Sequence, residues 1–230
     1  MRRPPVVLAY HGVRAVDEAE DPERLVLDPE KFEAQLRLLQ RLGYVFVTAD
    51  ELIAGAPARG TACATFDDGF ADAVDVVLPI LQRLGIRGSF YVCPGWWDGQ
   101  HAAVPGPGGA LLGRDGARAL HAAGMEVASH TLTHPDLRGC GDAELAAELG
   151  DSRAQLEDVI GARVRTFAYP FGLSDERVRA ATRAAGYELA LGWLPGPWDA
   201  FDVPRLPAPP RHGAGRLAVK LLAGVRRPGR

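Results

Sequence analysis

The sequence predicts one α/β domain built on a parallel sheet that curves into a barrel. Three observations predict this fold: short apolar runs alternate with longer segments of helical spacing, seven such runs occur, and no linker or change in composition separates them. The chain has 230 residues, of which 47% are hydrophobic and 24% charged, a composition typical of a globular protein with a sizeable core.

The seven predicted strands are short runs of mainly apolar residues. In chain order they are Val6–Tyr10, Tyr44–Val47, Ala62–Phe66, Gly88–Cys93, Met125–Ala128, Thr166–Tyr169 and Tyr187–Leu191. Because the segments between them have helical spacing, we expect the strands to lie parallel to one another, as they do when helices connect them.

Helices are predicted between the strands. They cover Pro29–Leu42, Val74–Leu84, Gly113–Ala123, Asp142–Ile160 and Ser174–Ala185. Asp28 is expected to cap the first helix before its proline, and Ser174 to cap the last one. Gly85, Gly161 and Gly186 mark the ends of three of these segments, and Gly95–Gly113, rich in glycine and proline, is predicted to be a long loop.

Charge and cysteine content argue against some classes of function. A net charge of −3 at pH 7 argues against nucleic acid as a partner, because phosphate binding needs a basic surface. The cysteines Cys63, Cys93 and Cys140 lack metal-ligand spacing and indicate buried thiols in a reducing compartment. The apolar run at the N-terminus is too short for a signal peptide, and no window reaches the ~18 apolar residues of a membrane-spanning helix. We therefore expect a cytoplasmic protein.

Candidate functional residues follow four of the predicted strands at the point where each ends. They are His11, the adjacent pair Asp67 and Asp68, His130, and the Pro170–Gly172 turn. The carboxyl ends of parallel strands meet at one face of such a fold, where active sites gather. We therefore expect these four segments to form one site.

The two aspartates and two histidines predict a metal site with catalytic function. If His130 and His134 lie on one helical turn, they point the same way, and one aspartate completes a His-His-Asp set that leaves a position open for water. The other carboxylate is then free to act as general base. We expect zinc foremost, with cobalt, nickel or manganese as alternatives, because such a set accepts all four. Plainer interpretations remain for both pairs. The two aspartates could be a helix cap and a turn residue, and the two histidines could be a cap and a surface residue.

These motifs resemble those of the polysaccharide deacetylases of carbohydrate esterase family 4, the NodB-homology domain. Thr65–Gly69 matches the family's Thr-Phe-Asp-Asp-Gly motif without change, His130–His134 matches its His-Ser/Thr-x-x-His motif, and Ala168–Gly172 matches its third motif in part. The resemblance covers roughly residues 5 to 207. It implies a distorted (β/α)7 barrel of the NodB-homology type.

The resemblance also implies a role for each site residue. Asp67 would be the catalytic base, and Asp68, His130 and His134 would bind the metal. The backbone N–H of Phe171 would stabilise the oxyanion. Tyr169, in the same turn, would belong to the substrate-binding group.

The chain departs from the family pattern in two places. Ala168 stands where the third motif usually has an arginine that orients the catalytic aspartate, and no late Leu-x-His segment is evident to supply the general acid. The Tyr10-His11 pair resembles the branch that includes poly-N-acetylglucosamine deacetylases, in which an N-terminal histidine replaces the late one. We therefore expect His11 to be the general acid and Arg205, placed in the substrate-binding group, to orient Asp67. The alternatives remain that His11 is a core or loop histidine without a catalytic role, and that Arg205 is only a structural ion-pair partner.

The function expected from the resemblance is metal-dependent hydrolysis of an N-acetyl group on an amino sugar, which releases acetate and a free amine. With no export signal expected, a lipid- or nucleotide-linked sugar or a glycosylated metabolite fits better than a finished wall polymer. Two alternatives stay open: hydrolysis of another small amide or a cyclic imide at the same site, and an inactive module that only binds metal or sugar.

The last twenty residues form a region of their own in this prediction. We assign residues 1–210 to the deacetylase-like domain and residues 211–230 to a basic tail with six Lys or Arg and no acidic residue. Its leucines could form a short amphipathic helix on anionic lipid, or the tail could be a solvated terminus.

Overall fold

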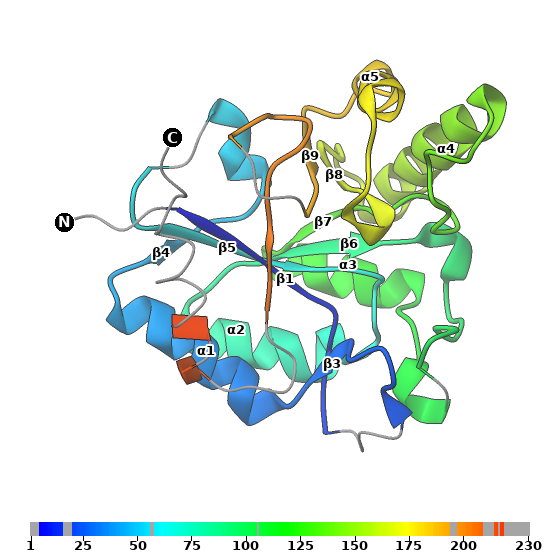
Figure 1. Cartoon of the computed structure of the whole chain (residues 1–230). Helices are drawn as coiled ribbons and strands as arrows, with labels where there is room; N and C mark the ends of the chain where they lie inside the picture. The colour runs from blue at the N-terminus through cyan, green and yellow to red at the C-terminus, as the bar shows by residue number, and fades with distance from the viewer. Residues whose placement is uncertain are drawn as a thin grey trace.

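The computed structural model describes residues 5–15, 20–55, 58–104, 106–193, 197–208, 214–215 and 217–218. It is an α/β fold whose parallel sheet curls into a half-barrel, with helices on its outer side (Figure 1). Most of the predicted basic tail lies outside the described residues. Leu217, one of its few described residues, is fully buried in the main core, so the chain beyond residue 210 contributes to the packing of the domain.

The main sheet has eight strands in the described residues, and all of them pair in parallel. They are β1 (Val6–Tyr10), β4 (Val45–Phe46), β5 (Thr61–Phe66), β6 (Ser89–Val92), β7 (Glu126–Ser129), β8 (Thr166–Ala168), β9 (Leu189–Leu191) and β10 (Leu206–Pro207). The first seven overlap the seven predicted strands. A separate pair, β2 (Gly12–Val13) and β3 (Val26–Leu27), follows the end of β1.

Five α-helices connect these strands. They are α1 (Pro29–Arg41), α2 (Leu78–Leu84), α3 (Arg114–Ala122), α4 (Asp142–Ile160) and α5 (Glu176–Ala184). Asp28 caps α1 as predicted, accepting hydrogen bonds from the N–H groups of Glu30 and Lys31. The cap of α5 is Asp175 rather than Ser174, because the Asp175 carboxylate accepts the Val178 N–H. None of the helices in the described part of the chain combines the length and the hydropathy that crossing a bilayer requires.

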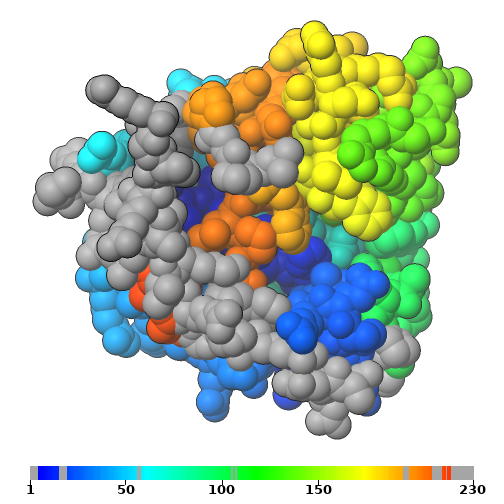
Figure 2. All heavy atoms as spheres, viewed as in Figure 1, coloured from blue at the N-terminus to red at the C-terminus, as the bar shows by residue number. Residues whose placement is uncertain are grey.

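The segment at 203–208 connects the two edges of the curled sheet. Near its start, Val203 bridges β9 through two backbone hydrogen bonds, and further on β10 pairs with β1. Figure 2 shows this segment, in orange, beside the dark blue atoms of the N-terminal strand. The late part of the chain is therefore held against its first strand.

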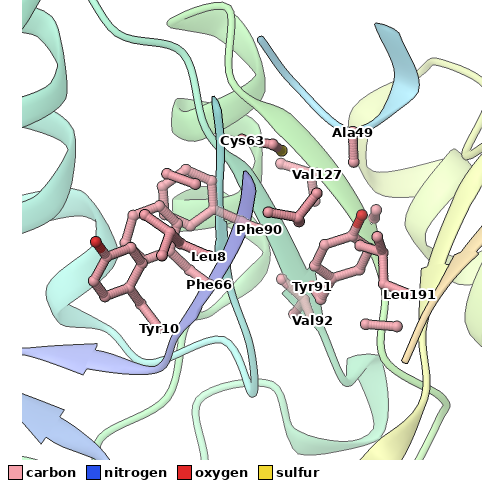
Figure 3. Close-up of a cluster of buried hydrophobic side chains, with 14 of the residues drawn as sticks. Leu8, Tyr10, Ala49, Cys63, Phe66, Phe90, Tyr91, Val92, Val127 and Leu191 are labelled. Atoms are coloured by element: carbon pink, nitrogen blue, oxygen red, sulfur yellow. The ribbon is translucent and has the colours of Figure 1, made fainter. Parts of the chain in front are cut away.

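An aromatic layer fills the space between the sheet and α1. Phe66 stacks on Phe90 at 4.7 Å between ring centroids and on Tyr10 at 5.4 Å, and Phe32 of α1 meets Tyr10 edge-on. Figure 3 shows Tyr10, Phe66 and Phe90 gathered together, away from Tyr91. Burial of such rings, at about 1.5–3 kcal/mol each, fixes the strands against the helix.

Polar side chains form a connected network inside the curl. The Tyr91 hydroxyl lies 3.1 Å from that of Thr166, and the hydroxyls of Thr166 and Ser89 donate to the Glu126 carboxylate at 2.5 and 2.6 Å. Burial raises the pKa of Glu126 to about 7. The network therefore contains a half-buried, titratable carboxyl group at the start of β7 that the sequence pattern did not single out.

Candidate metal centre and active site

The site lies at the carboxyl ends of the strands, as predicted. Strand β1 ends before His11, β5 before Asp67, β7 before His130, and β8 one residue before a 3-10 turn at Pro170–Gly172. These segments line a cavity of about 270 Å³. Its lining residues are His11, Glu23, Leu25, Asp67, Asp68, His101, His130, His134, Phe171 and Trp193.

Asp67 is buried and paired with a buried arginine. Arg205, beside β10, donates from Nη1 to Oδ1 of Asp67 at 2.7 Å and to the Thr65 hydroxyl at 3.1 Å. Its Nε donates to the Gly192 carbonyl at 3.2 Å. Burial alone would raise the pKa of Asp67, but the Arg205 guanidinium and His130 hold that pKa below its ordinary value. Arg205 thus lies where the sequence predicts an orienting arginine, but it is absent from the cavity lining, so direct contact with substrate is not supported.

The Asp68 carboxylate faces histidines on both sides. Its Oδ1 lies 3.4 Å from Nε2 of His130 and 3.5 Å from Nε2 of His134. Its Oδ2 lies 3.3 Å from Nε2 of His101 and 4.0 Å from Nε2 of His11. Burial acts to raise the pKa of Asp68, but the surrounding imidazoles, His101 first, hold it well below its ordinary value.

His130 and His134 converge through a bend rather than through one helical turn, so the helical prediction is wrong. No helix covers these residues, and both Thr131 and His134 have positive φ, at 69° and 62°. The Thr131 hydroxyl accepts the His134 N–H at 2.8 Å, which closes the bend and brings the two imidazoles to 4.8 Å between centroids. Such backbone costs about 1–3 kcal/mol per residue and persists only where the surroundings hold it.

A carboxylate on α4 holds this bend. Glu148 is buried, and its Oε2 accepts the N–H groups of Leu132 at 2.8 Å and Thr133 at 2.9 Å, while its Oε1 accepts the Thr133 hydroxyl at 2.5 Å. Sequence reasoning missed Glu148, because an acidic residue in a helix carries no signal of an inward-facing role. It contributes to the site by fixing the backbone between the two histidines.

Asp68, His130 and His134 fit a divalent metal. One ligand atom from each lies within 4.8 Å of the others, and within the described part of the chain the buried Oδ1 of Asp68 has no hydrogen-bond partner. The Nδ1–H of His130 donates to the Ala168 carbonyl at 2.7 Å, which leaves Nε2 free toward Asp68. Burial lowers the pKa of His134 to about 4, so its imidazole is neutral at pH 7, as a ligand must be.

The third motif supplies an exposed ring and a strained turn. Phe171 has a positive φ of 57°, a side chain that is 58% exposed, and a ring 4.8 Å from that of His134. Tyr169 differs from its prediction as a substrate-binding residue: its side chain is fully buried, its hydroxyl donates to the Phe201 carbonyl at 2.9 Å, and it is absent from the cavity lining.

Four residues of the cavity lining, Glu23, Leu25, His101 and Trp193, were not assigned to the site by the sequence. His101 is buried beside Asp68. Trp193 lies over the turn so closely that a Cβ placed on Gly172 would come within 1.7 Å of its Cδ1. No motif or spacing marks either residue, so only the folded chain brings them to the site. His11 is at the site as predicted, with 16% of its side chain exposed.

Comparisons with known proteins agree with this geometry. The family model described as polysaccharide deacetylase matches residues 54–190, more than half of the chain. A chitooligosaccharide deacetylase of Bradyrhizobium sp. (strain ANU 289) is 31% identical over 70% of this chain and 64% of its own length. Chitin deacetylase 1 of Cryptococcus neoformans is 26% identical over 60% of this chain and 27% of its own length. The chain therefore spans less than two thirds of either relative.

Solved structures share the fold over nearly the whole chain. The deacetylase PplD of Streptococcus pyogenes, in complex with acetate, superposes with a TM-score of 0.81 at 22% identity, covering 96% of this chain and 98% of that one. IcaB of Ammonifex degensii gives a TM-score of 0.77 at 22% identity, covering 95% and 97%. The predicted fold class is confirmed. With the family model matched over most of the site, the chain belongs to the polysaccharide deacetylase family.

Proposed function

We propose that this protein is a metal-dependent deacetylase that hydrolyses the N-acetyl group of an amino sugar to a free amine and acetate. The observation that carries the proposal is that the two adjacent aspartates have different partners. Asp68 faces two histidines, whereas Asp67 pairs with Arg205. One carboxylate is thus available as a ligand and the other as a base. The names of the related chitin and chitooligosaccharide deacetylases support an acetylated sugar as the substrate.

Asp68, His130 and His134 would hold the metal, with zinc foremost and cobalt, nickel or manganese as alternatives. A divalent ion bound there would acidify water and polarise the acetamide carbonyl. The Glu148 carboxylate and the Ala168 carbonyl keep the histidines in place for it.

Asp67 acts as general base and takes the proton of the attacking water. Arg205 keeps that carboxylate ionised and fixes one of its two oxygens, which leaves the other for the proton. The Phe171 N–H donates to the oxygen that becomes negative as water adds to the carbonyl.

His11 acts as general acid and protonates the departing nitrogen. Its ring lines the cavity with Asp67 and Asp68, and Trp193 lies 6.2 Å from it between ring centroids. Leu25, Phe171 and Trp193 give the cavity apolar walls that suit an acetyl group and the face of a sugar ring.

The test is acetate release by zinc-loaded protein from N-acetylated chitooligosaccharides and from lipid- and nucleotide-linked N-acetylglucosamine. Asp67→Asn keeps the shape of the side chain but removes its basicity, so we expect kcat to fall by about 10²–10⁴. His121→Gln, at an exposed position on α3, is the matched control and should leave kcat unchanged. Full activity in Asp67→Asn would exclude Asp67 as the base.

The alternative of another small amide or a cyclic imide keeps the same site and changes only the bond that is cleaved. Arg205, beside β10, places a cation on Asp67 although Ala168 replaces the usual arginine of the third motif, which supports the amino sugar as the first choice. A substrate panel still tests it: cleavage of non-sugar amides with acetylated sugars inert would favour it. Metal binding without hydrolysis of any substrate would favour an inactive module.

A further inference from the structure

His101 lies in the segment between β6 and α3, which the sequence presents only as a loop rich in glycine and proline. This segment packs on Val26 and Phe70 in a small second core, in which Val26, Phe70, Val104 and Leu111 are buried together. His101 stacks on Phe70 at 4.9 Å between ring centroids, so its ring is held by that core. The side chain is only 9% exposed.

Backbone contacts fix His101 from both sides. Its N–H donates to the Gly109 carbonyl at 2.7 Å, and its carbonyl accepts the Val104 N–H at 3.2 Å. A Cβ on Gly109 would come within 1.9 Å of the Val104 carbonyl oxygen, so this close approach requires glycine. Trp96 meets the His101 ring edge-on at 5.8 Å and lies 5.4 Å from the ring of His134. The imidazole therefore has a defined position in the wall of the site.

The orientation of the ring determines what it can offer to Asp68. Its Nδ1 accepts the Ala103 N–H at 3.2 Å, so a neutral imidazole carries its proton on Nε2. Nε2 lies 3.3 Å from Oδ2 of Asp68, on the side of the carboxylate away from His130 and His134. A donor on Oδ2 leaves Oδ1 to face the two histidines.

We propose that His101 is a positioning residue for the metal centre: its Nε2–H holds Oδ2 of Asp68, so that this carboxylate offers Oδ1 to a divalent ion together with His130 and His134. The inference rests on the metal site of the proposed function and extends it to a residue outside the ligand set. Within the described residues, the set whose ligand atoms lie within 4.8 Å of one another contains Asp68, His130 and His134, and not His101. Groups that orient ligands in this way affect metal affinity by about 10- to 100-fold.

The experiment compares Zn²⁺ affinity, measured by competition with a chromophoric chelator, for the unaltered protein and three variants. His101→Phe keeps the aromatic stack on Phe70 but removes the donor, and His101→Gln keeps an N–H donor. His121→Phe, at the exposed position on α3, is the matched control. Absorption spectra of the Co²⁺-loaded proteins report the ligand set, and acetate release gives kcat and KM.

We expect His101→Phe to bind Zn²⁺ about 10- to 100-fold more weakly, still at one ion per chain and with an unchanged Co²⁺ ligand set. His101→Gln should recover much of that loss, and His121→Phe should match the unaltered protein. If thermal unfolding shows that His101→Phe is not folded, the comparison of His101→Gln with His101→Ala replaces it.

Three results would overturn the inference. They are equal Zn²⁺ affinity in His101→Phe and the unaltered protein, equal losses in His101→Phe and His101→Gln, and a Co²⁺ spectrum in His101→Phe that shows a lost ligand. Failure of the unaltered protein to bind Zn²⁺ or to release acetate would instead count against the proposed function, so the two failures are distinguishable.

Discussion

Glu148 of α4 accepts both the backbone N–H and the hydroxyl of Thr133, at 2.9 and 2.5 Å, and so binds a helix to the bend between His130 and His134. Neither residue contacts the cavity. The bend has positive φ at a β-branched residue, Thr131, so it depends on partners such as Glu148 to persist.

We therefore expect Glu148→Gln to weaken Zn²⁺ binding by about 10- to 100-fold, because the amide can accept on one atom only and the histidines lose their spacing. Chelator competition measures the change. Glu144→Gln, at an exposed position one turn earlier on the same helix, is the control and should bind Zn²⁺ normally. Equal affinities in the two variants would show that the bend holds its shape without Glu148.

Replacing Arg205 by methionine should reduce both stability and activity. The substitution leaves the buried Asp67 carboxylate without its cation, and breaking a buried pair from one side costs about 3–5 kcal/mol. Urea unfolding measures the free energy and acetate release the activity. In the double variant Arg205→Met with Asp67→Asn, stability should partly return while activity does not. Arg83→Met, which removes an exposed arginine bound to Glu33, should cost about 1 kcal/mol or less.

The Glu126 carboxyl group should make stability depend on pH. Its folded-state pKa is raised from 4.5 to about 7, so between these values the unfolded chain loses the proton while the folded chain retains it. Its contribution is therefore fully present below about pH 4.5 and is lost as pH rises through about 7, by at most about 3 kcal/mol.

Glu126→Gln should remove that decline. The free energy of unfolding is measured for both proteins from pH 5 to 8. As the pH rises through this range, Glu126→Gln should become more stable relative to the unaltered protein. A constant difference across this range would mean that Glu126 titrates with an ordinary pKa in the folded protein.

Gly172→Ala should disturb the cavity through Trp193. The added methyl group would overlap the indole, at 1.7 Å from Cδ1, and the residue has a positive φ of 63°. We expect KM to rise more than kcat falls, and the fluorescence of Trp193 to change. Gly124→Ala is the control, because it has a φ of 80° but nothing within 4 Å of its Cβ. Gly124→Ala therefore carries only the backbone penalty of about 1–2 kcal/mol. If its KM is unaltered, the rise in KM of Gly172→Ala is due to the overlap with the Trp193 indole.

Local patterns were sufficient to predict the regular elements of the fold. The seven predicted strands and the helices between them correspond to apolar runs and to three- and four-residue spacings, which neighbouring residues encode directly. The short strands β2, β3 and β10 were missed because none of them lies in a proline-free apolar run of four residues, whereas the equally short β4 lies within the run Tyr44–Val47. The cap of α5 was misplaced by one position, since Ser174 and Asp175 are both good caps and only the fold chooses between them.

The site was predictable where its residues are contiguous in a motif. Asp67, Asp68, His130 and His134 are recognisable from their spacing and from the strands before them, whereas the bend at Thr131 depends on Glu148. His101, Glu148 and Trp193 reach the site from elements far along the chain, so no local pattern could mark them. Tyr169 is the opposite case: it lies inside a motif, but its side chain is buried in the hydrophobic core.

The pairing of β10 with β1 has a consequence for a chain that is still being made. Arg205 follows Asp67 by 138 positions, which a ribosome adding 5–20 residues per second synthesises in roughly 7 to 28 s. Asp68 and both histidines are synthesised within that interval, whereas the cation for Asp67 is added only at its end. A nascent chain can thus acquire its metal ligands well before it can bury a charged base, and catalytic competence should appear only after the last strand docks.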